Sequence, residues 1–297
     1  MSAVAAVAAN PAAAGRATGL KPGRMYYLVG AICMALSAVM IAPLAAAIFA
    51  SFKTKEEANL VPPTYFPGTF GLESYERLWN YQAGLMTYVG NSLGAALLTI
   101  ILCLGLTIPA GFALARYPVP FKEGFFLVLL TALIIPYQAL LTPIFFMFVQ
   151  LKLHNSILGL AVIHTAIQMP FSVYIMRNSF ESVPKEIAEA AEMDGANSWQ
   201  TLLRIYLPAI RPAIVTVALF AFITSWNELL GALVIMSKGD AFTLPVILTA
   251  ARQQTILGGT DWGMLQAGIL ISIIPCVLFY LLLQRYYVSG LLSGAVK

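Results

Sequence analysis

Residues 78–115 read LWNYQAGLMTYVGNSLGAALLTIILCLGLTIPAGFALA, a run without Asp, Glu, Lys or Arg between Arg77 and Arg116. Because about 20 apolar helical residues cross a hydrocarbon core of about 30 Å, this run is long enough to span a bilayer. Barrel strands would alternate apolar and polar residues over about 10 positions, which this run does not do. The segment therefore predicts a transmembrane helix.

Other stretches of the chain predict the same kind of element. Four more contain no charged residue: 25–52, 124–151, 153–176 and 262–284. A fifth, 212–237, contains only Glu228. We expect an all-α integral membrane protein with six transmembrane helices, near 26–51, 87–115, 124–149, 157–177, 212–236 and 263–285.

The composition of the 297 residues excludes most soluble classes of protein. Hydrophobic residues make up 60% of the chain and charged residues 10%, with a mean hydropathy of +0.82, whereas soluble globular chains carry about 25% charged residues. The three cysteines lie in apolar runs, so neither a disulfide framework nor a metal site is predicted. A net charge of +4 without a basic cluster does not indicate nucleic-acid binding.

The positions of Lys and Arg predict the orientation of the helices. If both termini are cytoplasmic, 11 of the 17 Lys and Arg residues lie in inner segments and six in outer loops, as the positive-inside rule favours. Residues 1–24 are expected to form a disordered cytoplasmic arm, because no basic region precedes their alanine run as it would in a signal peptide. Residues 25–297 are expected to form one transmembrane domain that ends in a cytoplasmic tail at 286–297.

The longest inner loop, about 178–211, carries the strongest functional signal. It includes SFESVPKEIAEAAEMDGANSWQTLLRIYLPAIRP and predicts two short helices. Ser182 is a suitable N-cap for the first helix, and Gly195 is a suitable C′ residue after it. Ser198 is a suitable cap for a second helix that runs through Tyr206.

The first of these helices has small side chains on one face. Ile187, Ala190 and Ala191 recur at i, i+3 and i+4. They are flanked by three acidic residues, Glu186, Glu189 and Glu192. Such a helix suits close docking to a partner that supplies Arg or Lys. The alternative is a helix resting on lipid headgroups, but those helices usually have basic polar faces.

The spacing within the loop matches a known motif. Glu189, Ala190 and Ala191 are followed by Gly195 after three residues, and Ile205, Leu207 and Pro208 come after nine more. This arrangement resembles the EAA motif of bacterial ABC importer permeases, E-A-A-x3-G-x9-I-x-L-P. The resemblance assigns coupling to an ATPase to the following residues: Glu189, Ala190, Ala191, Met193, Asp194, Gly195, Ile205, Leu207 and Pro208.

Three further segments extend the resemblance. They are AGFALARY at 110–117, WNE at 226–228 and YVSGLLSGAVK at 287–297. All are similar to segments of the carbohydrate-uptake group of these permeases. The chain as a whole resembles the smaller, six-helix permease of the maltose-type transporter.

The resemblance implies a type I ABC importer transmembrane domain with a cytoplasmic coupling helix. That helix would sit in a cleft of an ATPase subunit, and closure of the ATPase dimer would switch a heterodimer of permeases between inward-facing and outward-facing states. The implied partners are a second permease subunit, the ATPase dimer, an extracytoplasmic solute-binding protein, membrane lipid and a sugar substrate, in the bacterial cytoplasmic (inner) membrane. The chain would not be an enzyme and would hold no cofactor. Because it lacks the phosphate loop G-x-x-x-x-G-K-[ST], ATP and Mg would be bound by the ATPase subunits.

Aromatic, amide and acidic residues inside the expected helices are candidates for a substrate path. They are Tyr137, Gln138, Gln168, Trp226, Asn227 and Glu228. An ionisable group within a membrane span usually faces the protein interior or a cavity. The alternative is that these side chains only hydrogen-bond neighbouring helices, and for Glu228 both interpretations stay open. His164 is expected to be buried and neutral.

The sequence disfavours two other functions. An ion-coupled secondary transporter usually shows inverted repeats or paired membrane acids, for which Glu228 alone is a poor basis. An intramembrane enzyme is disfavoured because we expect no Ser/His, Glu/His or metal constellation in the spans. The resemblance implies that the outer loop at 237–262 is a candidate contact for the solute-binding protein. The first outer loop, with its four glutamates, is another candidate surface.

Overall fold

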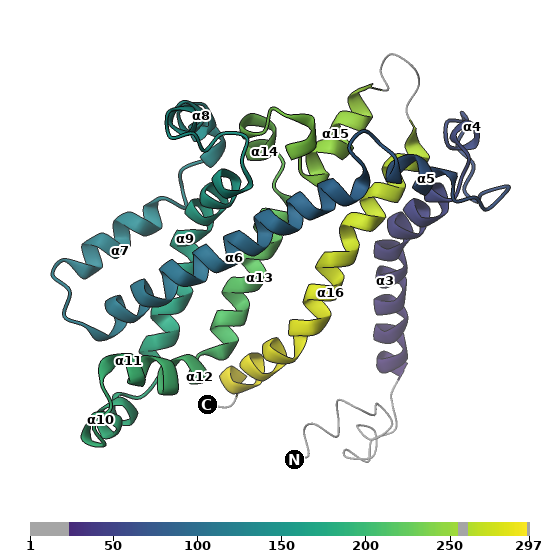
Figure 1. The fold of residues 1–297 in the computed structure, drawn as a ribbon. Coiled ribbons are helices and arrows are strands. Elements are labelled where there is room, and N and C mark those ends of the chain that lie inside the picture. Colours follow the sequence, from purple (N-terminus) through teal and green to yellow (C-terminus); the bar gives the residue numbers. More distant parts are fainter. Residues whose placement is uncertain (1–23, 255–260, 296–297) are drawn as a thin grey trace.

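The computed structural model describes residues 24–254 and 261–295, and the regular structure in these ranges is helical, without a strand (Figure 1). The α-helices are α3 Arg24–Ser51, α4 Lys55–Ala58, α5 Glu73–Trp79, α6 Leu85–Arg116, α7 Lys122–Thr131, α8 Leu141–Gln150, α9 Ile157–Glu181, α10 Lys185–Met193, α11 Ser198–Thr201, α12 Leu207–Ala209, α13 Arg211–Asn227, α14 Leu230–Ile235, α15 Leu244–Gln254 and α16 Trp262–Ala295. Two 3₁₀-helices are η1 Tyr137–Leu140 and η3 Gly239–Ala241, and η2 Leu202–Tyr206 is a π-helix. The arm expected at 1–24 lies outside the described residues, except for Arg24 at the start of α3.

Four of the described helices are long and apolar enough to cross a membrane. The spanning segments are Met25–Ser51 of α3, Leu85–Arg116 of α6, Ile157–Glu181 of α9 and Trp262–Gln284 of α16. These confirm the first, second, fourth and sixth expected helices, although α16 continues as a helix to Ala295. A fifth crossing results if Ser198–Ala209 and Arg211–Asn227, which meet at 78°, count as one bent span.

The expected third helix, 124–149, is not continuous. α7 ends at Thr131 and helical structure resumes at Tyr137, so α7 and α8 are separate helices of 10 residues each that run in different directions (Figure 1). Pro136 explains the break, because proline lacks an N–H and disfavours a helical residue before it. The third expected helix is therefore two helical segments, separated between Thr131 and Tyr137.

The expected fifth helix, 212–236, is also interrupted. α13 ends at Asn227, Glu228 is extended with φ −71° and ψ 125°, and α14 begins at Leu230. No proline lies at this break. The charged residue that interrupts the apolar run therefore directly follows the last residue of α13.

The centre of the fold is formed by α6, α9 and α13, which pack against one another. Gly111 of α6 lies against α9 so closely that a Cβ atom there would be 2.5 Å from Cβ of Met176. Small residues at membrane helix crossings permit this approach of two backbones. Gly111 thus fixes the crossing point of α6 and α9.

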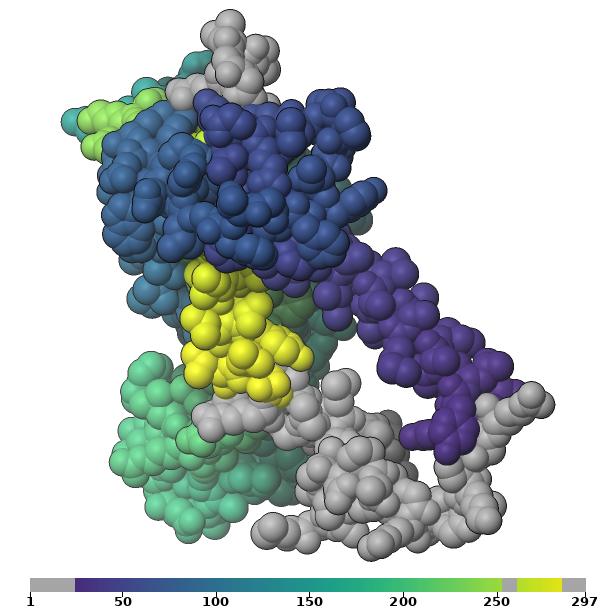
Figure 2. All heavy atoms as spheres, turned by 90° about the vertical axis from the view of Figure 1, so that its right-hand side faces the viewer, coloured from purple at the N-terminus to yellow at the C-terminus, as the bar shows by residue number. Residues whose placement is uncertain are grey.

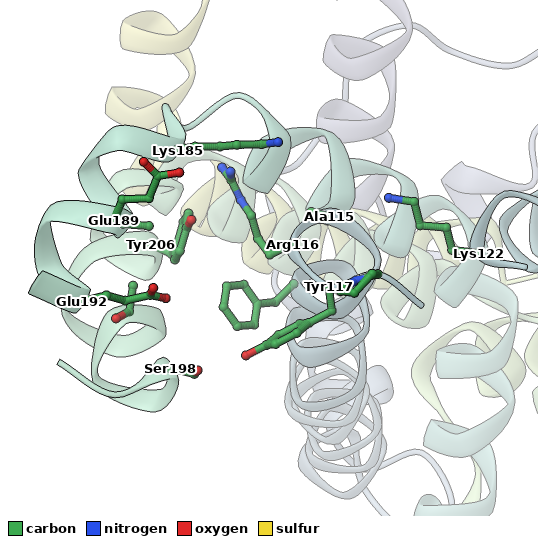
Figure 3. A pocket seen from close by; sticks show the side chains of 13 residues that line it. Ala115, Arg116, Tyr117, Lys122, Lys185, Glu189, Glu192, Ser198 and Tyr206 are labelled. Carbon is green, nitrogen blue, oxygen red and sulfur yellow. The ribbon is translucent and has the colours of Figure 1, made fainter. Parts of the chain in front are cut away.

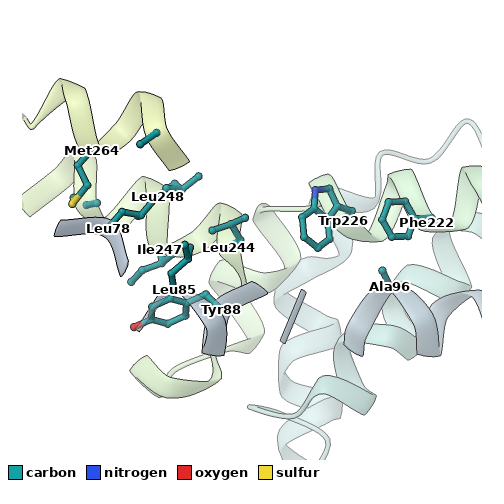
Figure 4. Packing of buried hydrophobic residues seen from close by; sticks show 12 residues of the cluster. Leu78, Leu85, Tyr88, Ala96, Phe222, Trp226, Leu244, Ile247, Leu248 and Met264 are labelled. Atoms are coloured by element: carbon teal, nitrogen blue, oxygen red, sulfur yellow. The ribbon is translucent and has the colours of Figure 1, made fainter. Parts of the chain in front are cut away.

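A hydrophobic cluster holds the helices together at the end of the bundle where α5 and α15 lie. Buried side chains from α5, α6, α13, α15 and α16 form one cluster, and Figure 4 shows Leu78, Tyr88, Trp226, Leu244 and Met264 among them. By contrast, α3 has α16 as its main helical neighbour and leans away from the bundle in Figure 2. Most α3 side chains are exposed in the isolated chain, as expected of a segment surrounded by lipid or by another subunit.

Candidate functional site

The loop expected to couple to a partner forms a compact hairpin, residues 185–209, that projects beyond the ends of α6, α9 and α13 (Figure 1). α10 begins after Pro184 and not after Ser182. Ser182 instead follows the last residue of α9, and its hydroxyl donates a hydrogen bond to the carbonyl of Ser179 at 2.8 Å. The predicted N-cap role of Ser182 was therefore wrong.

The end of α10 has the geometry predicted for it. Gly195 has φ +85°, and its N–H donates to the carbonyl of Glu192 at 3.0 Å, while the N–H of Ala196 donates to the carbonyl of Ala191 at 2.9 Å. This pair of bonds is the Schellman motif, in which the C′ residue adopts the left-handed conformation that glycine tolerates. The C′ role of Gly195 is confirmed.

The second helix of the hairpin starts one residue earlier than predicted. Asn197, and not Ser198, is the N-cap: its side chain accepts from the N–H of Gln200 at 2.9 Å, and the Gln200 side chain accepts from the N–H of Asn197 at 3.0 Å. This reciprocal pair is a capping box. The helix then widens into the π turn η2, and Pro208 lies inside the following turn α12 and does not end the helix.

The exposed surface of the hairpin differs from the face expected from sequence. Only Ala191 of the predicted small-residue face is buried, whereas Ile187 and Ala190 are exposed. The most exposed large apolar side chains are Met193, at 89%, and Trp199, at 64%. Trp199 was not among the predicted residues, although a tryptophan in an otherwise polar turn was a usable signal.

The other predicted coupling residues lie around this apolar surface. Exposed residues are Glu189, Asp194, Gly195 and Pro208, and partly buried ones are Ile205 and Leu207. The acidic residues of α10 are exposed as well: Glu186, Glu189 and Glu192. The hairpin therefore presents carboxylates beside two large apolar side chains.

A cavity of about 470 Å³ separates α10 and α11 from the end of α6 (Figure 3). Its lining includes Arg116 and Lys122 on the side of α6 and α7, and Glu189 and Glu192 on the side of α10. The cavity thus separates one side of α10 from the end of α6, while Ala188 of α10 packs against the hydrophobic cluster of the bundle.

An ion-pair group also joins the start of α7 to α9 near the hairpin. Arg177 donates to Glu123 at 2.6 Å and to Glu181 at 2.9 Å, and its guanidinium lies 4.3 Å from the ring centre of Phe126. The hydrogen bond from Arg177 holds the pKa of Glu123 below its ordinary value. This contact fixes α7 to α9 despite the interruption after α7.

Glu228 lies at the centre of a buried polar cluster. Its Oε1 accepts hydrogen bonds from the Tyr137 hydroxyl at 2.5 Å and from the N–H of Gly231 at 2.7 Å. Its Oε2 accepts from the N–H of Ala232 at 3.1 Å and lies 3.3 Å from Nε2 of His164. The carboxylate therefore satisfies the free N–H groups at the start of α14, which explains the break without a proline.

The cluster continues away from Glu228 towards α6. Nδ1 of His164 lies 2.7 Å from the hydroxyl of Ser225, which accepts a hydrogen bond from the Thr99 hydroxyl at 3.3 Å. His164 is fully buried, as expected. The expectation that the spans hold no Ser/His or Glu/His group was wrong, because the fold brings together residues far apart in sequence. Ser225 is itself buried, with only 4% of its surface exposed.

The other candidates for a substrate path are not gathered at one place. Gln168 is buried and accepts from Thr224 at 3.1 Å, and Trp226 is buried and donates to the carbonyl of Ser272 at 2.9 Å. Asn227 is exposed and donates to the carbonyl of Ile223 in its own helix. Tyr137 and Glu228, which are far apart in the sequence, are the two candidates that hydrogen-bond to each other.

Tyr137 and Gln138 do share a cavity. This space of about 490 Å³ lies between η1, α8 and α9 and is lined mainly by apolar side chains, with Pro136 at the break among them. Within the described ranges no three His, Cys, Asp or Glu residues lie close enough together to hold a metal ion.

Residues 107–291, which include the hairpin and most of the Glu228 cluster, match the model of the family described as binding-protein-dependent transport system inner membrane component. The chain belongs to this family. The resemblance to permeases found in the hairpin motif is thereby confirmed, and the chain is a multi-pass transporter subunit and not a catalytic enzyme.

Curated relatives and a solved structure agree with this assignment. This permease is 33% identical over 262 residues to the arabinooligosaccharides transport system permease protein of Halalkalibacterium halodurans, covering 87% of this chain and 92% of the relative. It is 30% identical over 275 residues to the diacetylchitobiose uptake system permease protein of Streptomyces coelicolor, covering 93% and 98% of the two chains. Its fold matches a chain in the crystal structure of a bacterial ABC transporter involved in the import of the acidic polysaccharide alginate, with a TM-score of 0.76, 22% identity and coverage of 89% and 97%.

Proposed function

We propose that this permease is one half of a heterodimeric pore in an ATP-driven importer and that ATPase subunits dock on the hairpin 185–209. The observation that carries the proposal is the hairpin surface itself. Met193 and Trp199 are large apolar side chains exposed outside the apolar bundle. Aromatic and methionine side chains of this kind are typical anchors of protein interfaces, and the carboxylates beside them suit a partner with Arg or Lys.

The same proposal assigns ATP and Mg to the partner ATPase subunits and no cofactor to this chain. The energy for transport then enters through movement of α10. Rigid-body movement about packed interfaces is a known physical class of switch between two states. An extracytoplasmic solute-binding protein would deliver the substrate to the opposite face.

We assign the substrate to the carbohydrate class. Support comes from the two curated relatives, which are named for arabinooligosaccharides and diacetylchitobiose and are covered over at least 92% of their lengths. Binding of a panel of oligosaccharides, monosaccharides and sugar alcohols to the cognate solute-binding protein tests this assignment. Strong binding of amino acids or metal ions, with none of the sugars bound, would overturn it.

The proposed topology has six crossings with both termini cytoplasmic in a bacterial inner membrane. The third crossing combines α7, η1 and α8, and the fifth combines α13 and α14. Support comes from the excess of Lys and Arg on the inner side and from Figure 1, where the start of α3 and the end of α16 lie on the side of the hairpin. Labelling of single cysteines at Met193 and Val61 from the two membrane sides tests it.

We place the substrate path beside the cavity that Tyr137 and Gln138 line. Glu228 would orient Tyr137 there through their hydrogen bond. Trp226 is left out of the path because its ring is buried in the core and its N–H is already paired. Gln168 and Asn227 are left out because their side chains bond to α13.

The docking proposal is tested with Glu189→Lys and Gly195→Asp in the complete complex. Both variants should insert normally, hydrolyse ATP and lose substrate uptake. Glu56→Lys is the matched control, because Glu56 is an exposed acid on a short helix in the first outer loop. Normal uptake by both hairpin variants would contradict the docking assignment. Ion-driven transport by this chain alone in proteoliposomes would support a secondary transporter instead.

A further inference from the structure

Arg116, the last residue of α6, lies at the base of the hairpin. We propose that Arg116 is the positioning residue that fixes both segments of the hairpin base to α6, so that displacement of α10 reaches the α6–α9 pair. This inference rests on the proposed docking of an ATPase on α10. It concerns what happens after docking, and the two can fail separately.

The first contact of Arg116 is with the segment that leads into the hairpin. Its Nη2 donates hydrogen bonds to the carbonyl oxygens of Phe180 and Val183. The last carbonyls of a helix have no donor within that helix, and a cation near a helix C-terminus is electrostatically favoured. Arg116 therefore closes the end of α9 at the point where the chain turns into α10.

The second contact is with the segment that returns from the hairpin. The guanidinium carbon of Arg116 lies 4.8 Å from the ring centre of Tyr206, on η2. Arginine stacks on aromatic faces in this way. A single guanidinium thus contacts both the outgoing and the returning segment of the hairpin.

Aromatic packing supports the same junction from one turn earlier in α6. The ring centres of Phe112 and Phe180 are 5.3 Å apart, as are those of Phe112 and Tyr206, and those of Phe180 and Tyr206 are 5.8 Å apart. Phe180 and Tyr206 are almost fully buried. We call Phe112, Arg116, Phe180 and Tyr206 the base cluster; it joins α6 to both segments of the hairpin.

Elsewhere the hairpin meets the bundle through apolar packing, in which Leu202 shares a hydrophobic cluster with Cys103 of α6. The cavity described above lies between α10 and the end of α6, and Figure 3 shows Arg116 and Tyr206 at one side of it, with Lys122 towards α7. The base cluster, which contacts both segments of the hairpin, therefore gives a force applied to α10 a direct route to α6. Lys122 lines the same cavity but belongs to α7, which makes it the natural control.

The test uses the complete complex with its ATPase subunits and solute-binding protein. Arg116→Met should leave co-purification of the ATPase intact and reduce uptake about tenfold or more, because it removes charge-assisted hydrogen bonds. Arg116→Lys should recover little, since lysine cannot place a planar group against Tyr206 while it donates to two carbonyls. Lys122→Met should keep normal uptake.

A distance measurement separates a positioning role from a general loss of structure. Spin labels are placed at the exposed positions Glu186 of α10 and Thr87 of α6, with Cys33 and Cys276 replaced by Ala. In the otherwise native complex the distance should have one narrow distribution, both with and without ATP. Arg116→Met should broaden it, and Tyr206→Phe, which keeps the ring, should not.

A narrow distribution and normal uptake in Arg116→Met would overturn the role of Arg116. If instead the native chain fails to co-purify with an ATPase, the proposed function is wrong, and the base cluster has no displacement of α10 to transmit. Broadening in Lys122→Met equal to that in Arg116→Met would also overturn the proposal, because any loss of positive charge at the cavity would then suffice.

Discussion

The Tyr137 hydroxyl donates a hydrogen bond to Oε1 of Glu228 at 2.5 Å and connects the two places where expected transmembrane helices are interrupted. Tyr137 opens η1 after the break between α7 and α8, and Glu228 lies in the break between α13 and α14. Interrupted helices expose backbone groups, which membrane proteins satisfy with side chains or with cavity water. Here Glu228 caps the start of α14 and also accepts a hydrogen bond from Tyr137 at the break between α7 and α8.

This relationship predicts the effect of Tyr137→Phe. The variant keeps the ring but removes one hydrogen bond to a buried carboxylate, which costs about 1.5–3 kcal/mol. The melting temperature of the purified complex should fall. Tyr65→Phe is the control, because Tyr65 is 85% exposed. An equal melting temperature for the native chain and Tyr137→Phe would show that the bond contributes nothing to stability.

Gly111 provides a second prediction. Its replacement by Ala would place Cβ 2.5 Å from Cβ of Met176, so α6 and α9 must separate at a cost of about 1–3 kcal/mol. The yield of assembled complex should drop. Gly105→Ala on the same helix, where nothing lies within 4 Å of an added Cβ, should be neutral or stabilise by up to about 1 kcal/mol. Equal yields of the two variants would contradict the close crossing.

Trp199 is predicted to be an anchor of the ATPase interface. Trp199→Ala should weaken ATPase binding about 30-fold, as loss of a hot-spot side chain worth about 2 kcal/mol would, while folding is unchanged. Titration of the ATPase subunit against the permease in detergent measures this. Trp79→Ala is the matched control, because Trp79 is 54% exposed but lies on α5. Equal weakening by both variants would argue against the hairpin as the docking surface.

The backbone at Gly195 gives a prediction about the hairpin alone. With φ +85° and nothing within 4 Å of an added Cβ, Gly195→Ala should cost about 1–2 kcal/mol through backbone strain only. Gly195→Asn should cost less, since Asn tolerates this conformation. Hydrogen exchange in α10 should therefore increase in the order native, Asn, Ala. Gly239→Ala, at an open position without positive φ, should leave the exchange in α10 unchanged.

Local patterns in the sequence were enough to predict the uninterrupted helices and the turn at Gly195. Both depend on residues close together in the chain: apolar runs for α6 and α9, and a glycine after an acidic helix for α10. The family also followed from local spacing, because the motif from Glu189 to Pro208 lies in one loop.

The polar cluster and the base cluster could not be predicted in the same way. His164 and Glu228 are 64 residues apart, and Arg116 and Phe180 are also 64 apart, so no periodicity links them. The helix break at Glu228 was hidden for a related reason. Nothing in the run around Glu228 indicates that its carboxylate will accept hydrogen bonds from the N–H groups of Gly231 and Ala232.

The placement of α3 has a consequence for how the protein is made. Its main helical neighbour, α16, is the last helix of the chain, so α3 leaves the ribosome long before that neighbour exists. During synthesis α3 therefore lies in the bilayer without its main helical neighbour until α16 is made. The apolar side chains of Met25–Ser51 keep α3 stable in the bilayer during this interval, because hydrocarbon tails solvate them as well as another helix does.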